Sequence, residues 1–284
     1  MQTETVDYYV MKTLDSLEGW TYPSLPLKHD NKNLFLGSGN ASNVAGIFAK
    51  KFGGNAVSVA NYKEYLSARH TSDFASINII NASGGKDGIN MASFLKENGF
   101  NFSLFTCNPQ PPAGEFTPKE NVFVFPSFVE PPTYNVSTYA SMIYAIMKEN
   151  VGDIKENIKN MEIPDLRKHK FIFFVAEDKY ELPAVMSARK VGESLAGLGS
   201  AGEGIATAVH GMLVHENNDR LDFCMNCDTG TKNTYKLEID SYLGLIMSAY
   251  YIIGKNQTAS DMESIMKNYT STAQKLGWKF NKVW

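Results

Sequence analysis

The feature that most constrains the fold is a repeated order of apolar run, glycine-rich turn and helical segment. NLFLGSGNAS leads into VAGIFAKKFGG, and SINIINASGG leads into INMASFLKENGF. Each helical pattern ends at glycine, which often terminates a helix. This alternation predicts a parallel, doubly wound α/β sheet, whose ligands bind beyond the carboxyl ends of the strands.

The pattern continues along the chain and restarts after residue 150. We expect an amphipathic helix at 3–17 and one or two helices in TYASMIYAIMKENVGDIKENIKNM. The predicted fold class is α/β, with two lobes, each a mainly parallel, doubly wound sheet flanked by helices in an αβα sandwich. The lobes are expected at 1–150 and 151–284. Further strands are expected in AVSVAN, FSLFTCNP, NVFVFPS, KHKFIFFVAED, DRLDFCMNC and TYKLEI, and helices in ELPAVMSARKVGESLAGL and SYLGLIMSAYYIIGKN before a polar tail.

Composition narrows the class of protein. Hydrophobic residues make up 43% and charged residues 20% of the chain, as in folded proteins. The net charge of −3 argues against a dedicated nucleic-acid binder, which needs a basic surface. No stretch approaches the ~20 apolar residues of a membrane span, and the acidic N-terminus does not read as a secretory signal. We expect a cytoplasmic protein with neither nucleic acid nor membrane as a partner.

Three cysteines are present, and two of them form the sequence CMNC at 224–227. This spacing occurs in metal knuckles and redox pairs, but zinc needs about four ligands and no second CxxC exists. LDFCMNC also reads as a buried strand, where cysteine acts as a small hydrophobe. We favour the core interpretation for Cys224 and Cys227 over a metal or redox role, and expect neither metal nor cofactor.

The first glycine turn, GSGNAS at 37–42, combines flexible backbone with a helix start, which suits an anion. A dinucleotide-binding turn is the competing interpretation. It requires a third glycine at position 42 and an acid at the end of the next strand. Position 42 is Ser, and that strand ends in Ala60-Asn61, so the nicotinamide interpretation is weak.

The second turn, NASGGK at 81–86, is more distinctive. Ser83, the two glycines and Lys86 could wrap and neutralise a phosphate. It lacks the GxxxxGK[ST] spacing of a nucleotide triphosphatase. The alternative is an ordinary strand-to-helix turn with a solvated lysine.

A third candidate site contains Lys190, Glu193 and His210. Lys190 and Glu193 share one helical face, and a carboxylate there could act as a general base. Histidine side chains in general titrate near neutrality, so a histidine at position 210 could open a sugar ring or shuttle a proton. By themselves these residues are more typical of a solvated surface glutamate and an ordinary turn histidine.

Taken in order, these segments resemble the sugar-isomerase (SIS) family, including the isomerase domain of glucosamine-6-phosphate synthase. GSGNAS and NASGGKDG stand at that family's glycine turn and Ser/Thr phosphate loop, and FVEPPTYNVSTYASM at its glutamate-containing segment. ELPAVMSARKVGESL resembles its Lys-x-x-Glu helix, and GSAGEGIATAVHG ends like its Glu-x-x-His-Gly motif. The matches run from about residue 34 to residue 211.

The resemblance implies a homodimer that isomerises a phosphorylated sugar without a cofactor. Glu193 would be the base between C1 and C2, Lys190 a further catalytic residue, and His210 would reach the sugar from the partner chain. The substrate-binding residues implied are Gly39, Asn40, Asn81, Ser83, Gly84, Lys86, Glu130, Ser137 and Thr138.

The chain departs from the family pattern at several positions. Asn81, Ala82 and Lys86 replace the hydroxyl and polar residues of the phosphate loop, and Thr207 replaces the glutamate before the histidine. The family's C-terminal lysine segment has no recognisable match. The alternatives are therefore a removal of an amine from the sugar, a sensor that binds sugar phosphate without turnover, and a deglycase of amino-acid–sugar phosphates.

Overall fold

The structure, a computed structural model, describes residues 4–22, 25–131 and 133–275. The chain forms two compact units, and it passes between them more than once. The first unit contains Thr21–Val129 and Ser137–Met147. Of the described residues, the second unit contains 4–20, Glu130–Val136 and 148–275. The boundary at residue 150 stays a prediction.

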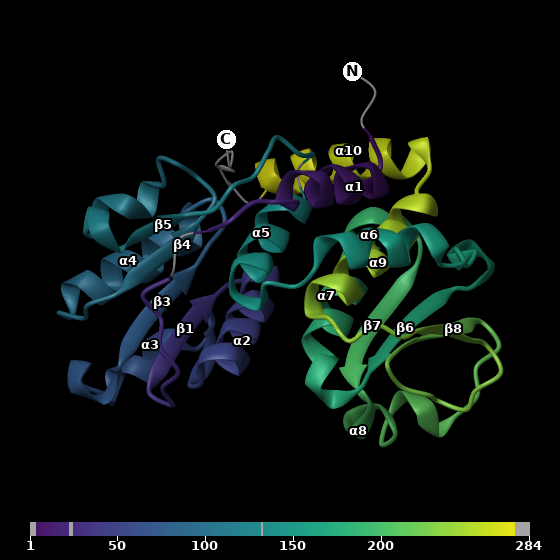
Figure 1. Cartoon of the computed structure of the whole chain (residues 1–284), viewed down its shortest axis with the longest axis horizontal. Coiled ribbons are helices and arrows are strands. Elements are labelled where there is room, and N and C mark those ends of the chain that lie inside the picture. Colours follow the sequence, from purple (N-terminus) through teal and green to yellow (C-terminus); the bar gives the residue numbers. More distant parts are fainter. Residues whose placement is uncertain (1–3, 23–24, 132, 276–284) are drawn as a thin grey trace. The chain divides into compact units, whose positions relative to one another are not determined.

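A parallel five-stranded sheet forms the centre of the first unit (Figure 1). The strand order is β2-β1-β3-β4-β5, with Leu36 of β1 opposite Ile79 of β3. The elements are β1 Asn33–Gly37, α2 Asn40–Phe52, β2 Asn55–Ser58, α3 Tyr62–Ser67, β3 Ser76–Ile80, α4 Lys86–Glu97, β4 Ser103–Thr106, β5 Val122–Val124 and α5 Val136–Met147, of which Val136 belongs to the second unit.

The central strands of this sheet are the apolar runs seen in the sequence. All five residues of β1 are buried, whereas β2 and β5 lie at the edges and are partly exposed. Apolar side chains of β1, β3, α4 and β4 form one core cluster, which places the glycine turns at the end of a rigid sheet. The short helix α3 was not among the predicted elements.

The second unit has a parallel sheet of four strands, in the order β7-β6-β8-β9. β7 was not predicted, because GSAGEG has no apolar run. Its glycines serve close packing: a Cβ on Gly202 would lie 2.4 Å from the Ala184 carbonyl oxygen in α7. The elements are α1 Val6–Leu17, α6 Val151–Asn160, β6 Phe171–Ala176, α7 Glu181–Ser194, β7 Gly199–Gly204, α8 Ile205–Ala208, β8 Arg220–Met225, β9 Thr234–Leu237, α9 Tyr242–Lys255 and α10 Ala259–Lys275.

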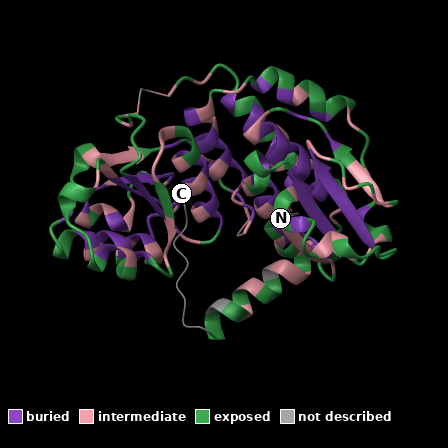
Figure 2. Ribbon diagram, turned by 90° about the horizontal axis from the view of Figure 1, so that it is seen from below, coloured by how far each residue is buried: buried purple, intermediate pink, exposed green. Residues whose placement is uncertain are grey.

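Helix α1 packs against α9, although more than two hundred residues separate them. The contact is close, since a Cβ on Gly254 would lie 2.0 Å from the Asp7 nitrogen. The expectation of a polar tail after α9 is wrong up to Lys275, because α10 occupies that stretch. Figure 2 shows α10 largely exposed, in contrast to the buried strands. Residues 276–284, with Trp278, Phe280 and Trp284 of the predicted tail, lie outside the described residues.

Two parallel sheets, each flanked by helices, confirm the predicted α/β fold class. Within the described ranges, no helix has both the length and the apolar character to cross a membrane.

Candidate functional site

The carboxyl ends of β3 and β4 and the start of α5 are joined by hydrogen bonds in the first unit. The Cys107 N–H donates to the Ala82 carbonyl oxygen at 2.8 Å, and Asn108 Nδ2 donates to the Ser83 carbonyl oxygen at 3.0 Å. Cys107 Sγ contacts the Thr138 carbonyl oxygen at 3.5 Å. These bonds fix the turn after β3 beside the first turn of α5.

The backbone conformation of the turn at 81–86 requires a glycine at position 84. Gly84 has φ of +62°, and a Cβ there would lie 2.3 Å from Pro111 Cβ, so only glycine fits. Ser83 Oγ accepts a hydrogen bond from the Gly85 N–H at 3.1 Å. Lys86 is exposed and begins α4, whose N-terminal N–H groups carry partial positive charge. Asn81 is buried at the foot of the turn.

The other glycine turn lies at the end of β1, the neighbour of β3 in the sheet. Gly39 has φ of +54° and immediately precedes α2. Asn40 is buried, and its Oδ1 accepts from Asn43 Nδ2 at 3.3 Å. Both glycine turns therefore lie at one edge of the sheet, as predicted, and the Asn40 carbonyl group is already engaged.

The two predicted hydroxyl residues of α5 differ in their surroundings. Ser137 Oγ accepts from the Phe128 N–H at 3.3 Å. Thr138 is 1% exposed, and its Oγ1 has no hydrogen-bond partner within the described part of the chain. A buried hydroxyl without a partner costs free energy. Of these two hydroxyl groups, that of Thr138 could therefore still form a hydrogen bond with a ligand.

In the second unit, the structure joins Lys190 to Glu193 near the end of α7. Lys190 is fully buried, and its Nζ lies 2.7 Å from Glu193 Oε2. The same Nζ donates to the carbonyl oxygens of Thr133, at 2.7 Å, and Tyr134. The Glu193 side chain is 33% exposed, so one carboxylate oxygen is held while the side chain still reaches solvent.

Glu130, predicted to bind substrate, serves as a helix cap. It is 3% exposed, and its Oε2 accepts from the Val136 N–H, the first residue of α5, at 2.6 Å. A carboxylate at this position stabilises the helix start. Burial first and the Glu130 charge second raise the pKa of neighbouring Tyr9.

His210 lies apart from Glu193 in the same chain. α7 runs antiparallel to β7, because Ser200 Oγ bonds the Ala188 carbonyl oxygen at 2.7 Å while Gly202 packs against Ala184. Glu193 therefore lies near the amino end of β7, and His210 follows its carboxyl end. Six residues at about 3.3 Å each separate the two ends by about 20 Å.

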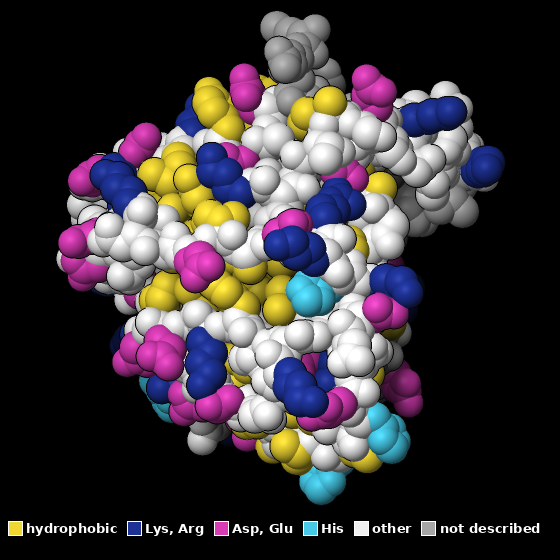
Figure 3. All heavy atoms as spheres, turned by 90° about the vertical axis from the view of Figure 1, so that its right-hand side faces the viewer, with side chains coloured by type: hydrophobic (Ala, Val, Ile, Leu, Met, Phe, Trp, Pro, Cys, Tyr) yellow, Lys and Arg dark blue, Asp and Glu magenta, His cyan; other side chains and the backbone are white. Residues whose placement is uncertain are grey.

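The surroundings of His210 are exposed and partly apolar. Val209 and Val214, on either side of it, are 49% and 57% exposed. Figure 3 shows apolar side chains and histidines together at the lower end of one face, the end at which Figure 1 places α8. No side-chain hydrogen bond or ion pair joins His210 to Glu193 or Lys190 among the residues that the structure describes.

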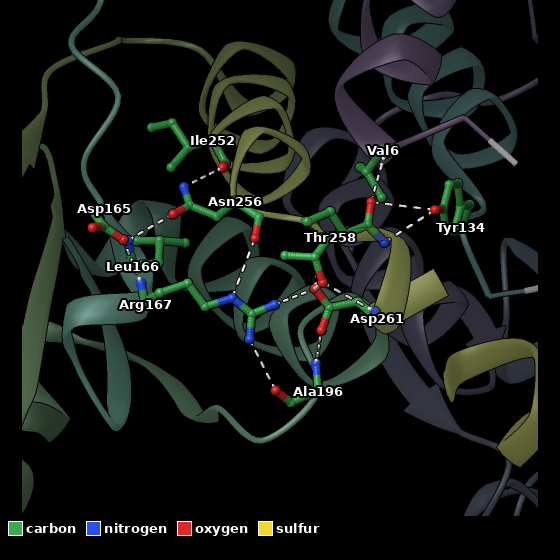
Figure 4. A network of polar contacts seen from close by, with 11 residues as sticks. Val6, Tyr134, Asp165, Leu166, Arg167, Ala196, Ile252, Asn256, Thr258 and Asp261 are labelled. Carbon is green, nitrogen blue, oxygen red and sulfur yellow. Dashed lines mark hydrogen bonds and ion pairs between the residues drawn. The ribbon is translucent and has the colours of Figure 1, made fainter. Parts of the chain in front are cut away.

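A polar network holds the chain directly after Glu193 (Figure 4). Asp261 Oδ1 accepts from the Ala196 N–H at 3.0 Å, and Arg167 Nη1 donates to the Ala196 carbonyl oxygen at 3.0 Å. Arg167 also pairs with Asp261. Gln257, from the same junction of α9 and α10, bonds the Tyr134 hydroxyl at 3.1 Å. These residues were not predicted, because each bond joins distant parts of the sequence.

Replacing Asp261 by asparagine is expected to lower the free energy of unfolding by about 2 kcal/mol at neutral pH. Burial acts to raise the pKa of Asp261, but hydrogen bonds from Thr258, Arg167 and Ala196 together hold it below the usual value. Stability from a lowered pKa is present above the unfolded-state value of about 3.9 and is lost as the pH falls.

Urea unfolding of both proteins at about pH 7 and about pH 3 measures this effect. The difference between them should shrink at the lower pH. The control is Asp219→Asn, since that carboxylate is 58% exposed in its pair with Lys170. A difference that is the same at both pH values would contradict the assignment.

Of the two cysteines, Cys224 lies in the core, as the favoured interpretation expects, and Cys227 lies at its margin. Cys224 is fully buried in β8 and contacts Thr229 Oγ1 at 3.6 Å. Cys227 lies beyond the end of β8 and is half-buried, with Sγ 3.2 Å from the Val175 carbonyl oxygen. In the described ranges, no group of three or more His, Cys, Asp or Glu residues could hold a metal ion.

Comparison with known proteins places the fold. No protein-family model and no curated protein matches the sequence. Glucosamine-6-phosphate deaminase from Thermotoga maritima is similar in structure, with a TM-score of 0.61 at 14% identity over 90% of this chain and 91% of that one.

Two further solved structures agree. The C-terminal domain of glucosamine-fructose-6-phosphate aminotransferase from Francisella tularensis has a TM-score of 0.62 at 11% identity, covering 92% of this chain and 95% of that chain. Tagatose-6-phosphate ketose/aldose isomerase from Escherichia coli has a TM-score of 0.56 at 12% identity, and the match covers 94% of this chain and 88% of that chain. These similarities confirm the fold that the sequence resemblance predicted.

Proposed function

We propose that this chain, which shares its fold with proteins named for sugar phosphates, binds a phosphorylated sugar and isomerises it between aldose and ketose. The observation that carries the proposal is the turn at 81–86. Its glycine-dependent backbone, the Ser83 hydroxyl, Lys86 and the start of α4 form an anion-binding arrangement of N–H groups and charge. Thr138 supplies a further buried hydroxyl at the same sheet edge.

Glu193 is the proposed general base. Its carboxylate is fixed on one side by Lys190 and remains partly exposed on the other, so it can accept a proton between C1 and C2 of a sugar. Isomerisation removes a proton from one carbon and adds one to its neighbour, with exchange between the base and solvent in between, so there is no net oxidation and no cofactor is consumed. The amine-removing reaction of an aminosugar phosphate would use the same base.

We propose that His210 acts in a homodimer, on the sugar held by the other protomer. His210 follows the carboxyl end of β7, whereas Glu193 lies near the amino end of that strand, and this supports action of His210 on a different sugar from the one on which Glu193 of the same chain acts. The exposed Val209 and Val214 beside it would then be covered by the partner. A cytoplasmic location stays a prediction from the sequence.

A sugar-phosphate sensor without turnover is the second candidate. It is favoured by the engaged Asn40 side chain. It is also favoured by Asn81 and Lys86 in place of hydroxyl residues and Ala82 in place of a polar one, which leave Ser83 as the only hydroxyl in the turn. A sensor would bind the ligand but leave the C2 proton in place.

Thermal unfolding against hexose, hexosamine and amino-acid-conjugated hexose phosphates tests the binding step. A ligand at about a hundred times its Kd adds ~2.7 kcal/mol, an easily measured shift. We expect a shift with one phosphorylated sugar, none with its unphosphorylated form, and a much smaller one in Ser83→Ala. A panel without any shift would contradict the proposed phosphate turn.

The same sugar phosphate, incubated with the protein in deuterated water, separates the two candidates. Deuterium at C2, detected by mass spectrometry, indicates the isomerase. Binding without exchange indicates the sensor.

A further inference from the structure

Lys190 makes contacts that leave it no access to a substrate. Its side chain is 1% exposed, and its ammonium donates to Glu193 and to the carbonyl oxygens of Thr133 and Tyr134. An ammonium has three N–H donors, so these three acceptors use all of them. The Tyr250 ring lies 5.1 Å from the same nitrogen and closes a further side.

The backbone that Lys190 holds is in an uncommon conformation. Thr133 has φ of +77° and Asn135 has φ of +46°, and positive φ is strained for a β-branched residue such as threonine. Thr133 Oγ1 has no hydrogen-bond partner among the described residues, so that side chain does not stabilise the turn. Such a turn persists only where its surroundings hold it.

The turn leads directly into α5. Glu130 caps the first residue of that helix, Val136, and the next two residues are Ser137 and Thr138. The Tyr134 hydroxyl is bonded to Gln257, which fixes the same segment from another side. Its conformation therefore determines where the first turn of α5 begins.

We propose that Lys190 is a positioning residue, which orients Glu193 and holds the strained 133–135 turn in place, and does not act on the sugar. This inference rests on the proposed function and revises the sequence-based prediction that Lys190 is catalytic. One buried charge thereby couples the base to the segment that starts α5.

The test is Lys190→Met, alone and combined with Thr133→Gly. Glycine adopts positive φ without strain, so it should relieve the need for Lys190. We expect Lys190→Met to raise KM about tenfold, because the released 133–135 turn no longer fixes the start of α5 and its proposed ligand Thr138, with a smaller fall in kcat from the less firmly held Glu193. Adding Thr133→Gly should lower KM again, to about one fifth of its value in Lys190→Met. Amide exchange at 134–136 should accelerate in the single variant and slow again in the double.

Lys255→Met is the matched control, because Lys255 also pairs with a carboxylate, Asp7, and lies 5.1 Å from a tyrosine ring, that of Tyr251. It should leave KM and exchange at 134–136 unchanged. A fall in kcat of more than about a hundredfold at constant KM, unaffected by Thr133→Gly, would overturn the inference and make Lys190 catalytic.

Two further outcomes are decisive. If Lys190→Met folds only in combination with Thr133→Gly, the proposal is supported. If neither folds, Lys190→Gln, which keeps donors for the carbonyl groups, should fold with slow amide exchange at 134–136; fast exchange there contradicts the proposal. If the unmodified protein turns over no sugar phosphate, the proposed function fails, while amide exchange at 134–136 still decides the role of Lys190.

Discussion

Replacing Glu193 by glutamine is expected to lower turnover of the sugar phosphate by about 10²–10⁴-fold, the usual contribution of a general base. Glutamine has nearly the same shape, and its amide oxygen can still accept from Lys190, so the end of α7 should keep its structure. The loss should therefore appear in kcat and in deuterium incorporation at C2, while ligand binding measured by thermal unfolding remains.

Glu181→Gln provides the control for this experiment. Glu181 is an exposed glutamate in the first turn of the same helix, and it should tolerate the change with normal turnover. Full activity of Glu193→Gln would remove the base assignment. Loss of activity in both variants would indicate damage to α7.

Replacing Arg220 by methionine is expected to lower the free energy of unfolding by about 3–5 kcal/mol, as for other buried ion pairs that lose one member. Arg220 and Asp222 are 4% and 2% exposed in their side chains, and Arg220 Nε lies 2.6 Å from Asp222 Oδ1. Arg220 also bonds the Met212 carbonyl oxygen, just after His210 and Gly211. Removing it leaves the Asp222 charge buried without its cationic partner.

The double variant Arg220→Met/Asp222→Leu should recover most of this loss, because no charge then remains buried. Urea unfolding of the single and double variants gives both values. Lys170→Met, which breaks an exposed pair with Asp219, should cost less than about 1 kcal/mol. A double variant no more stable than Arg220→Met would show that the loss comes from packing.

The fold could be predicted from the sequence mainly because its central strands are apolar, and an apolar run predicts a buried strand. Phe171–Ala176 is nearly fully buried, and its apolar sequence indicates this directly. Arg220–Met225 is fully buried although it contains the charged Arg220 and Asp222. β7 could not be predicted in this way, since its glycines are selected by the close approach of α7 and not by hydrophobicity. α10 was missed because its anchoring residue, Asp261, bonds distant partners.

The candidate site likewise has parts that the sequence could predict and parts that it could not. The 81–86 turn was visible because its glycines and serine are adjacent in sequence. The spacing of Lys190 and Glu193 predicted that both lie on one helix face, where the structure shows them as an ion pair. The carbonyl groups of Thr133 and Tyr134 carry no side-chain signature, so the partners that occupy Lys190 could be found only in three dimensions.

The packing of α1 on α9 has a consequence for synthesis on the ribosome. α1 ends at Leu17 and α9 begins at Tyr242, so at about 5–20 residues per second the apolar face of α1 waits roughly 11–45 s for the helix that covers it. The first unit lies almost wholly between these two helices in sequence and can fold during that interval. The apolar face of α1 therefore stays without its main packing partner until α9 has been synthesised.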